Sequence, residues 1–208
     1  KYVYGINVET SGPTSRGLFH AIKSTNNFIN NRNDIRNIHV AISGVGKVGG
    51  KLAILLARAG AKITAASINN EHIKKLKSEI SLVEANPNDL FKTNCDIISP
   101  CALGGVINQS NQHLLKCKAI VGAANNQLEN PLIAEWLLKN KIVYSPDYLV
   151  NSGGVIAIAS EINSTEDFLE QQLEKIADRL KAVLQESKKN NKSTDLVARR
   201  IAWKRINS

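Results

Sequence analysis

The chain has 208 residues, of which 43% are hydrophobic and 22% are charged, a balance typical of a globular protein with one large domain. No run of about 18 apolar residues is present, so no membrane-spanning helix is expected. The net charge of +9 gathers late in the chain, without interleaved aromatic residues or a nucleic-acid motif. We therefore interpret it as a solvated or partner-facing helix surface and expect no nucleic-acid partner.

Cysteine and methionine usage give two further expectations. Cys95, Cys101 and Cys117 are too few and too scattered for a disulfide framework or a metal site, and they suit a reducing cytoplasm. The chain contains no methionine and begins Lys1-Tyr2, so we expect it to be a piece of a longer protein.

The first part of the chain is predicted to be irregular and then helical. Gly5, Gly12 and Pro13 act as breakers in residues 1–13. An apolar stripe predicts a helix over residues 14–25, and the Asn-rich residues 26–37 are predicted to end that helix and form a loop.

Short apolar runs alternate with helical patterns in the middle of the chain, which predicts an α/β fold with a doubly wound parallel sheet of the Rossmann type. The predicted strands are residues 39–43, 61–67, 81–84, 95–99, 119–122 and 142–144. The predicted helices between them are residues 51–58, 70–78 and 131–139, the last with Trp136 half buried.

From Gly154 onward the pattern is helical only. Residues 155–161 are small and apolar, and Ser164 to Asp167 resemble a capping box that starts a helix with one buried face. A last helix is predicted over residues 195–206. We thus expect one dinucleotide-binding domain, 1–208, made of an N-terminal segment and helix (1–36), a Rossmann core (37–154) and additional C-terminal helices (155–208).

A glycine-rich turn follows the first predicted strand directly and leads into a helix. It reads Gly44-Val45-Gly46-Lys47-Val48-Gly49. In the dinucleotide-binding motif the first glycine makes a tight turn, the second lets the backbone approach the pyrophosphate, and the third lets the helix pack close to the strand. The helix N-terminus adds free N–H groups and a partial positive charge.

Three further clusters of small and polar residues follow predicted strands, where open α/β sheets bind their ligands. They are residues 99–105 (SPCALGG), 122–127 (GAANNQ) and 145–155 (SPDYLVNSGGV). Together with the glycine turn, they predict one extended ligand site.

In four segments the sequence resembles the glutamate/leucine/phenylalanine/valine dehydrogenases, most closely the leucine enzymes. The segments are GVGKVG at 44–49, CDIISPCALGGVIN at 95–108, GAANNQL at 122–128 and YSPDYLVNSGGVI at 144–156. The resemblance implies NAD(P)-dependent oxidative deamination of an L-amino acid to a 2-oxo acid and ammonia, by a protein that is a homo-oligomer when full length. It also implies that the substrate domain, which carries a catalytic Lys and Asp, is absent from this chain.

The same resemblance assigns roles to individual residues. Thr14 is expected near the nicotinamide carboxamide, and Asn125 between the ribose and the substrate. Val155 and Ile158 are expected to line the substrate side-chain pocket, where two aliphatic residues favour a branched-chain substrate; without the resemblance, burial in a helix core is as good an interpretation. The nicotinamide ribose is expected beside Pro100, Cys101 and Ala102.

One position departs from the family pattern. The residue that would bond the adenosine ribose is Ser67 rather than Asp, so repulsion of a 2′-phosphate is missing. NAD is expected as the cofactor, and NADP use stays open. A free-standing nucleotide-binding or regulatory module without catalytic activity is the alternative to an enzyme.

Overall fold

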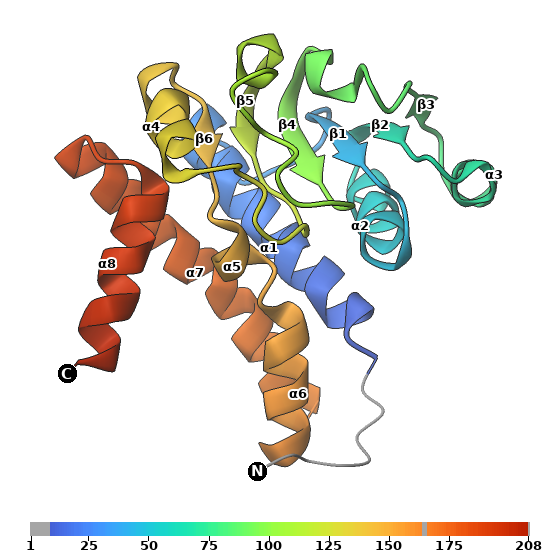
Figure 1. Cartoon of the computed structure of the whole chain (residues 1–208). Helices are drawn as coiled ribbons and strands as arrows, with labels where there is room; N and C mark the ends of the chain where they lie inside the picture. Colours follow the sequence, from blue (N-terminus) through green and yellow to red (C-terminus); the bar gives the residue numbers. More distant parts are fainter. Residues whose placement is uncertain (1–8, 164–165, 208) are drawn as a thin grey trace.

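Six parallel strands form one sheet in the computed structural model, which describes residues 9–163 and 166–207 (Figure 1). In sheet order they are β3 (Val83–Glu84), β2 (Lys62–Ala66), β1 (His39–Ser43), β4 (Cys95–Pro100), β5 (Cys117–Ile120) and β6 (Val143–Tyr144). The first strand in the sequence, β1, lies in the middle of the sheet. β2 and β3 are added on one side of β1, and β4, β5 and β6 on the other side. This order confirms the predicted doubly wound parallel sheet, with its switch point between β1 and β4.

Helices connect and flank these strands in the described parts of the chain. They are α1 (Ser11–Asn30), α2 (Lys47–Arg58), α3 (Asn70–Glu79), α4 (Pro131–Lys139), α5 (Asp147–Val150), α6 (Gly153–Asn163), α7 (Glu166–Asn190) and α8 (Thr194–Ile206), with 3-10 turns η1 (Leu90–Lys92) and η2 (Gln112–Leu114). No helix within the described ranges combines the length and the apolar character needed to cross a membrane.

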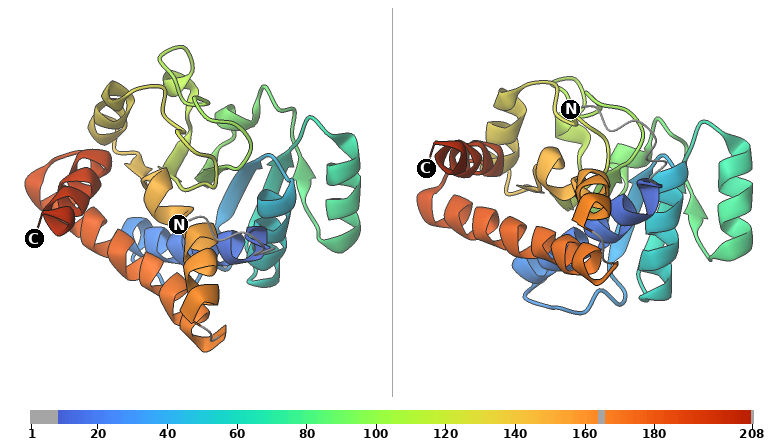
Figure 2. Two further views of the ribbon diagram at one scale, coloured as in Figure 1. Left: turned by 60° about the horizontal axis from the view of Figure 1, so that its bottom comes forward. Right: turned by 90° about the horizontal axis from the view of Figure 1, so that it is seen from below.

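The main core lies between the sheet, α1 and α7. Leu18 and Ile22 of α1 lie in one buried cluster with Ile42 of β1 and Leu173 of α7. A methyl group on Gly17 would come within 2.7 Å of Ile176 Cδ1, so α1 and α7 run side by side in close contact (Figure 2). The buried face predicted for α7 is confirmed. Ser164 and Thr165, part of the predicted capping box, lie outside the described residues.

Helix α1 differs from its prediction at both ends. Pro13 was expected to break regular structure but lies in the first turn of α1, where the missing N–H leaves no helical hydrogen bond unmade. Glu9 caps this turn, because its carboxylate accepts hydrogen bonds from Ser11 N at 3.0 Å and Gly12 N at 2.9 Å. Most of the predicted segment 1–13 (residues 1–8) lies outside the described residues.

The C-terminal end of α1 also extends beyond the predicted boundary at Thr25. Asn26 is fully buried, and its Nδ2 donates hydrogen bonds to the carbonyl oxygens of Arg32 at 2.7 Å and Asp34 at 3.0 Å. Asn31 then ends the helix in the left-handed region, with φ 53°. The Asn-rich stretch thus holds both the helix end and the loop, as predicted, but the helix ends at Asn30 rather than Thr25. The bonds from Asn26 hold the following loop against the helix.

Candidate functional site

Gly44 makes the tight turn after β1. Its φ is +89°, and a Cβ atom at this position would lie 2.6 Å from the Cβ of Ala102. Its N–H donates to Ala66 O at 2.8 Å, which holds the turn beside the end of β2. A residue with a side chain would meet both backbone strain and a clash here, so the first glycine has a defined structural reason.

Gly46 and Gly49 have opposite surroundings. A Cβ atom on Gly46 would meet nothing within 4 Å, whereas one on Gly49 would lie 2.0 Å from the carbonyl oxygen of Gly44. Gly49 therefore lets α2 pack directly on the turn, and Gly46 leaves one side of the turn open. α2 starts at Lys47, four residues before the predicted residue 51, because Gly46 is its N-cap and Gly49 lies in its first turn.

The first turn of α2 is prepared for an anion. Gly46 is its N-cap, provides no side-chain cap, and no acidic residue occurs in the first turn. The first N–H groups of a helix have no acceptor within the helix and carry a partial positive charge. A dinucleotide pyrophosphate fits this geometry, because the open side of Gly46 admits it without steric conflict.

The end of β4 lies against the same turn. Cys101 N donates to Ser43 O at 2.7 Å, and Ala102 packs on Gly44. Burial raises the pKa of the Cys101 thiol, so this cysteine is a protonated wall residue rather than a nucleophile. Pro100 O accepts a hydrogen bond from Ala124 N at 3.0 Å, which connects β4 to the 122–127 loop.

Gln127 closes the 122–127 loop on itself. This side chain is fully buried, and its Nε2 donates to Gly122 O at 2.8 Å and to Ala124 O at 2.9 Å. Sequence reasoning treated Gln127 only as one polar residue of the cluster. Its structural role depends on the loop conformation, so residue type alone gave no signal.

The side-chain amide of Asn125 has a fixed orientation. Asn151 Nδ2 lies 3.2 Å from Ala123 O and 2.6 Å from Asn125 Oδ1. A carbonyl oxygen can only accept, so the Asn151 group next to Ala123 must be its NH2, and that NH2 requires an acceptor from Asn125. Asn125 Oδ1 therefore accepts this hydrogen bond, and among the described residues its Nδ2 has no hydrogen-bond acceptor.

Asp147 holds the backbone of the next residue. Its carboxylate is buried, accepts a hydrogen bond from Asn126 N at 2.5 Å and receives another from Tyr144 OH at 2.9 Å. Burial, followed by the neighbouring Asp147 charge, raises the pKa of Tyr144, so its hydroxyl stays protonated and donates. Asn126 adopts φ 51°, and the charge-assisted bond stabilises this left-handed conformation.

Thr14 lies against the start of α6, the helix that carries Val155 and Ile158. Gly153 packs on the backbone of Pro13 and Thr14, and a Cβ on Gly154 would lie 3.1 Å from Thr14 Oγ1. Val155 is 72% and Ile158 44% exposed, so burial in a helix core is wrong for both. The Thr14 hydroxyl donates to Thr10 O at 2.8 Å and can offer a ligand only its acceptor lone pairs.

Ser67 lies one residue beyond the Ala66 carbonyl that holds Gly44, and its Oγ accepts from Asn69 N at 3.1 Å. A cavity of about 430 Å³ between α2 and α3 opens beside the glycine turn. Its lining includes Gly46 and four basic side chains, from Lys47, Lys51, His72 and Lys75. His72 and Lys75 of α3 therefore line the same cavity as Gly46 of the glycine turn, although both lie on the helix that follows Ser67.

Several of the predicted site residues therefore lie together beyond the carboxyl ends of the strands. Contacts join Gly44 to Ala102, Pro100 to Gly122, and Asn125 to Asn151, and Thr14 joins the start of α6. Which of them touch a cofactor or a substrate stays a prediction.

Comparisons with known proteins agree with this architecture. The family model described as Glutamate/Leucine/Phenylalanine/Valine dehydrogenase matches residues 66–207. The chain is 39% identical to phenylalanine dehydrogenase of Thermoactinomyces intermedius over 98% of its length and 56% of that protein. It is 34% identical to leucine dehydrogenase of Geobacillus stearothermophilus over 99% of its length and 58% of that protein.

A solved structure gives the same picture. The crystal structure of L-tryptophan dehydrogenase from Nostoc punctiforme superimposes with a TM-score of 0.91 at 33% identity, over 95% of this chain and 60% of that one. The chain thus spans somewhat more than half the length of the relatives that it matches.

Proposed function

This chain belongs to the glutamate/leucine/phenylalanine/valine dehydrogenase family, and we propose that it forms the cofactor-binding part of an amino-acid dehydrogenase for branched-chain L-amino acids. Dehydrogenases of this family are NAD(P)-dependent. The observation that carries the proposal is the glycine turn at the switch point of the sheet, where Gly46 leaves open space next to free helix N–H groups.

We assign a different part of the dinucleotide to each of three groups of residues. The turn from Gly44 to Gly49 would hold the pyrophosphate, and Ser67 the adenosine ribose. Pro100, Cys101 and Ala102 would form the wall beside the nicotinamide ribose. When bound, the nicotinamide ring supplies a hydride acceptor for the substrate.

Asn125 would act as a hydrogen-bond donor in this site. Because Asn151 occupies its Oδ1, the Nδ2 donor, which has no acceptor among the described residues, suits an oxygen atom of the cofactor ribose or of the substrate carboxylate. The proposal therefore assigns Asn151 as a positioning residue for Asn125, a role that the sequence pattern did not reveal.

The substrate side chain is proposed to contact Val155 and Ile158. Both are aliphatic and solvent-exposed on α6, which begins two residues after Asn151, the partner of Asn125. They favour leucine or valine over charged or large aromatic side chains. Relatives named for phenylalanine, leucine and tryptophan are all similar to this chain. Because these names do not decide the substrate, the proposal of leucine or valine rests on Val155 and Ile158.

Proton transfer would need the lysine and the aspartate that the family resemblance places in a separate substrate domain. The proposal therefore predicts that these 208 residues bind the dinucleotide without oxidising an amino acid. We also propose that the full-length protein is a homo-oligomer and that it is located in the cytoplasm.

Calorimetric titration of NAD and NADP into the chain, with an absorbance assay for nicotinamide reduction by L-leucine, tests this function. Saturable cofactor binding without turnover is the expected result. Reduction by the isolated chain would refute the assignment of proton transfer to another domain, and absence of cofactor binding would refute the site itself.

The alternative, a free-standing nucleotide-binding module, predicts the same binding but a different gene product. A native polypeptide near twice this length, with amino-acid oxidation, favours the enzyme. Its preference for leucine or valine over phenylalanine and glutamate tests the assignment of Val155 and Ile158.

A further inference from the structure

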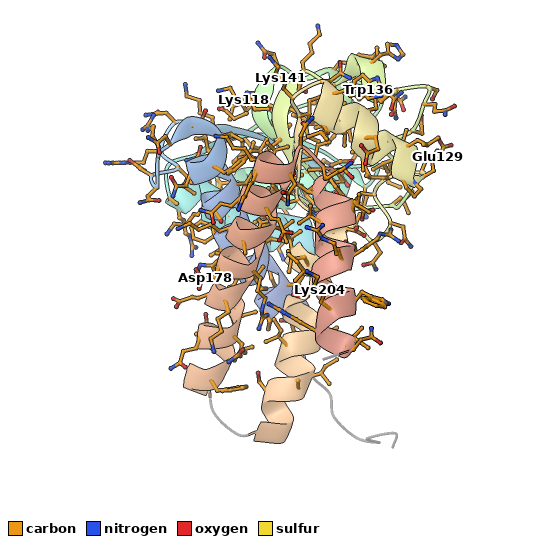
Figure 3. The ribbon with its side chains drawn as sticks, turned by 90° about the vertical axis from the view of Figure 1, so that its left-hand side faces the viewer. Lys118, Glu129, Trp136, Lys141, Asp178 and Lys204 are labelled. Atoms are coloured by element: carbon orange, nitrogen blue, oxygen red, sulfur yellow. The ribbon has the colours of Figure 1, made fainter. Side chains whose placement is uncertain are left out.

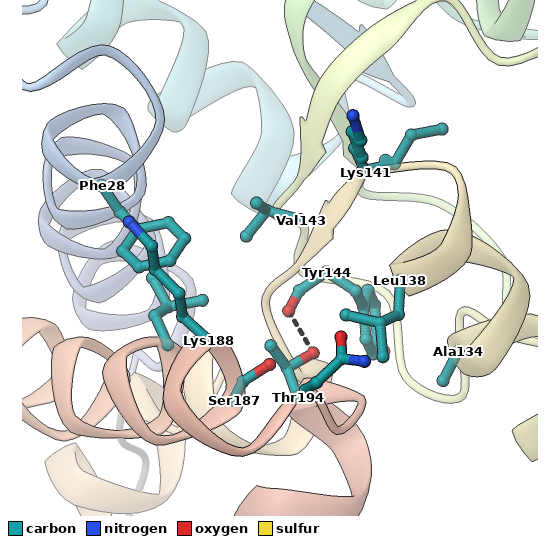
Figure 4. Close-up of a pocket in the computed structure, with 12 residues that line it drawn as sticks. Phe28, Ala134, Leu138, Lys141, Val143, Tyr144, Ser187, Lys188 and Thr194 are labelled. Carbon is teal, nitrogen blue, oxygen red and sulfur yellow. Dashed lines mark hydrogen bonds between the residues drawn. The ribbon is translucent and has the colours of Figure 1, made fainter.

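A cavity of about 270 Å³ lies between the loop that follows Asn125, the end of β6 with helix α5, and the start of α8. Residues 126–131 line it from the loop, Tyr144, Asp147 and Tyr148 from β6 and α5, and Asp195 and Arg199 from α8. Thr194 Oγ1 donates to Tyr144 O at 2.6 Å, the bond drawn in Figure 4. This bond attaches the start of α8 to β6, so two walls of the cavity are joined.

Two buried carboxylates line this cavity in fixed orientations. Asp147 is only 8% exposed and Asp195 only 9%. Each oxygen of Asp147 accepts one hydrogen bond, and Asp195 accepts one from Arg199 Nε at 2.9 Å and one from Tyr148 OH at 3.3 Å. A carboxylate offers about four acceptor positions, so both side chains can accept further hydrogen bonds.

Gln127 adds an acceptor that has no donor. The orientation of its amide is fixed, because the group next to the carbonyl oxygens of Gly122 and Ala124 must be the NH2. Oε1 is therefore the other end of the amide, and among the described residues it has no hydrogen-bond partner although the side chain is fully buried. Buried polar atoms without a partner are rare. Because Gln127 belongs to the cavity wall, we infer that its donor is a bound molecule.

The cavity is negatively charged, although the whole chain carries a net charge of +9. Three acidic side chains line it, those of Glu129, Asp147 and Asp195, against the one basic side chain of Arg199. Arg199 is paired with Asp195 at 2.9 Å. Asp147 and Glu129, the latter exposed and labelled in Figure 3, have no cationic partner within the described ranges. The lining therefore suits a cation that donates hydrogen bonds.

We propose that this cavity binds a small primary alkylammonium ion, at a site separate from the glycine turn and independent of the proposed enzymatic function. The ammonium group would donate hydrogen bonds to Asp147 and to Gln127 Oε1, and Asp195 would add a second negative charge. The short alkyl chain would contact Leu128 and Pro131, which also line the cavity.

Other classes of occupant match this lining less well. A neutral molecule would leave the buried carboxylates without a counter-charge, and a quaternary ammonium ion would leave Gln127 Oε1 without a donor. The described residues contain no group of three or more His, Cys, Asp or Glu side chains arranged for a metal ion. The volume lies just below the range of drug-sized sites, about 300–1,000 Å³, which favours a small amine.

The test uses n-butylammonium as the probe, with butan-1-ol as its uncharged counterpart and tetramethylammonium as a cation without N–H donors. Amide chemical shifts of the 208-residue chain are followed in titrations at constant ionic strength. Butylammonium should bind saturably and at least tenfold more tightly than either comparison molecule, with shift changes mainly at residues 126–131, 144–148 and 195–199. Ammonium chloride should bind more weakly than butylammonium, because it leaves the apolar wall uncovered.

Asp195→Asn removes one negative charge at nearly constant shape and should lower the affinity for butylammonium about tenfold, without changing that for butan-1-ol. Glu129→Gln, at an exposed position where the fold is not at risk, should lower it about threefold. Asp178→Asn is the matched control, because it makes the same change at an exposed residue of α7 that does not line the cavity (Figure 3), and it should bind like the wild type.

Several results would overturn the proposal. Equal affinity for butylammonium and for butan-1-ol or tetramethylammonium would remove the charge or the donor from the recognition. Unchanged binding by both Asp195→Asn and Glu129→Gln, or shift changes confined to other parts of the chain, would place the amine elsewhere. Absence of saturable binding would mean that water alone meets Gln127 Oε1.

Discussion

Alanine at Gly46 and alanine at Gly49 add the same methyl group to neighbouring positions, yet the two changes should have different results. The methyl group at Gly46 would meet no protein atom within 4 Å, whereas that at Gly49 would lie 2.0 Å from Gly44 O. Gly46→Ala should therefore preserve the fold and obstruct the pyrophosphate. Gly49→Ala should displace α2 from the turn and lower stability.

The magnitudes follow from the helix and from packing. Alanine within a helix gains about 1 kcal/mol over glycine. Overpacking costs about 1–3 kcal/mol, and the upper part of that range, about 2–3 kcal/mol, applies at Gly49 because the clash is with rigid backbone. A net loss of about 1–2 kcal/mol is expected, which corresponds to a fall in Tm of about 2–8 °C for a chain of this size. For Gly46→Ala we expect a stability change within about 1 kcal/mol and at least a tenfold loss of cofactor affinity, about 1.4 kcal/mol.

Thermal unfolding followed by circular dichroism, and calorimetric titration of NAD, measure the two effects separately. Gly50→Ala is the matched control, because its methyl group would come no closer than 3.2 Å to a protein atom, Val45 O. It should keep the wild-type affinity for NAD and lose less stability than Gly49→Ala. Wild-type affinity in Gly46→Ala would place the pyrophosphate elsewhere. An unchanged Tm in Gly49→Ala would refute the close contact between α2 and the turn.

Three other changes have defined outcomes. Ser67→Asp should tighten NAD and weaken NADP, by about ten- to a hundredfold for one charged hydrogen bond, and unchanged discrimination in titrations of both cofactors would mean that Ser67 is not at the ribose. Asn151→Leu removes the hydrogen bond that orients the Asn125 amide and should weaken NAD binding at least about threefold at nearly unchanged Tm. Gln109→Ala, at an exposed position, is the control and should bind NAD like the wild type. Hydrogen bonds from the Ser11 hydroxyl and the Gly12 N–H, with Lys51, lower the pKa of Glu9 from 4.5 to about 2. The ionised carboxylate therefore stabilises the fold fully above pH 4.5, and this contribution is lost as the pH falls toward 2. Urea unfolding should show that Glu9→Gln is less stable than the wild type at pH 7 and equally stable near pH 2.

Local patterns in the sequence were sufficient for the sheet and the glycine turn. Alternation of short apolar runs with helical stretches depends on residues close in the chain, and so do the three glycines of the turn. The boundaries of α1 could not be predicted in this way, since they depend on Glu9 as a cap and on Asn26 as a buried clamp. Both residues are common in loops, and only their contacts reveal that they extend a helix.

The site was predicted as a set of positions rather than as an arrangement of donors and acceptors. Asn125 was expected to face a ligand, but the direction of its amide is decided by Asn151, 26 residues later. Gln127 and Asp147 likewise act through bonds to backbone groups of the loop. Such bonds depend on the folded path of the chain, so they cannot be predicted from the spacing of residues in the sequence.

In the proposed enzyme, the position of α6 would connect the cofactor site to the choice of substrate. Gly153 places the start of this helix against the backbone of Pro13 and Thr14, and close packing of backbone on backbone leaves little freedom to shift. Val155 and Ile158 are therefore presented by a firmly seated helix, although both are exposed. An exposed aliphatic pair on a rigid element is suited to sort side chains by size, because the pocket wall cannot move away from a larger substrate. Substrate selection in the proposed enzyme would thus depend on the two glycines that seat α6 as well as on the residues that contact the substrate.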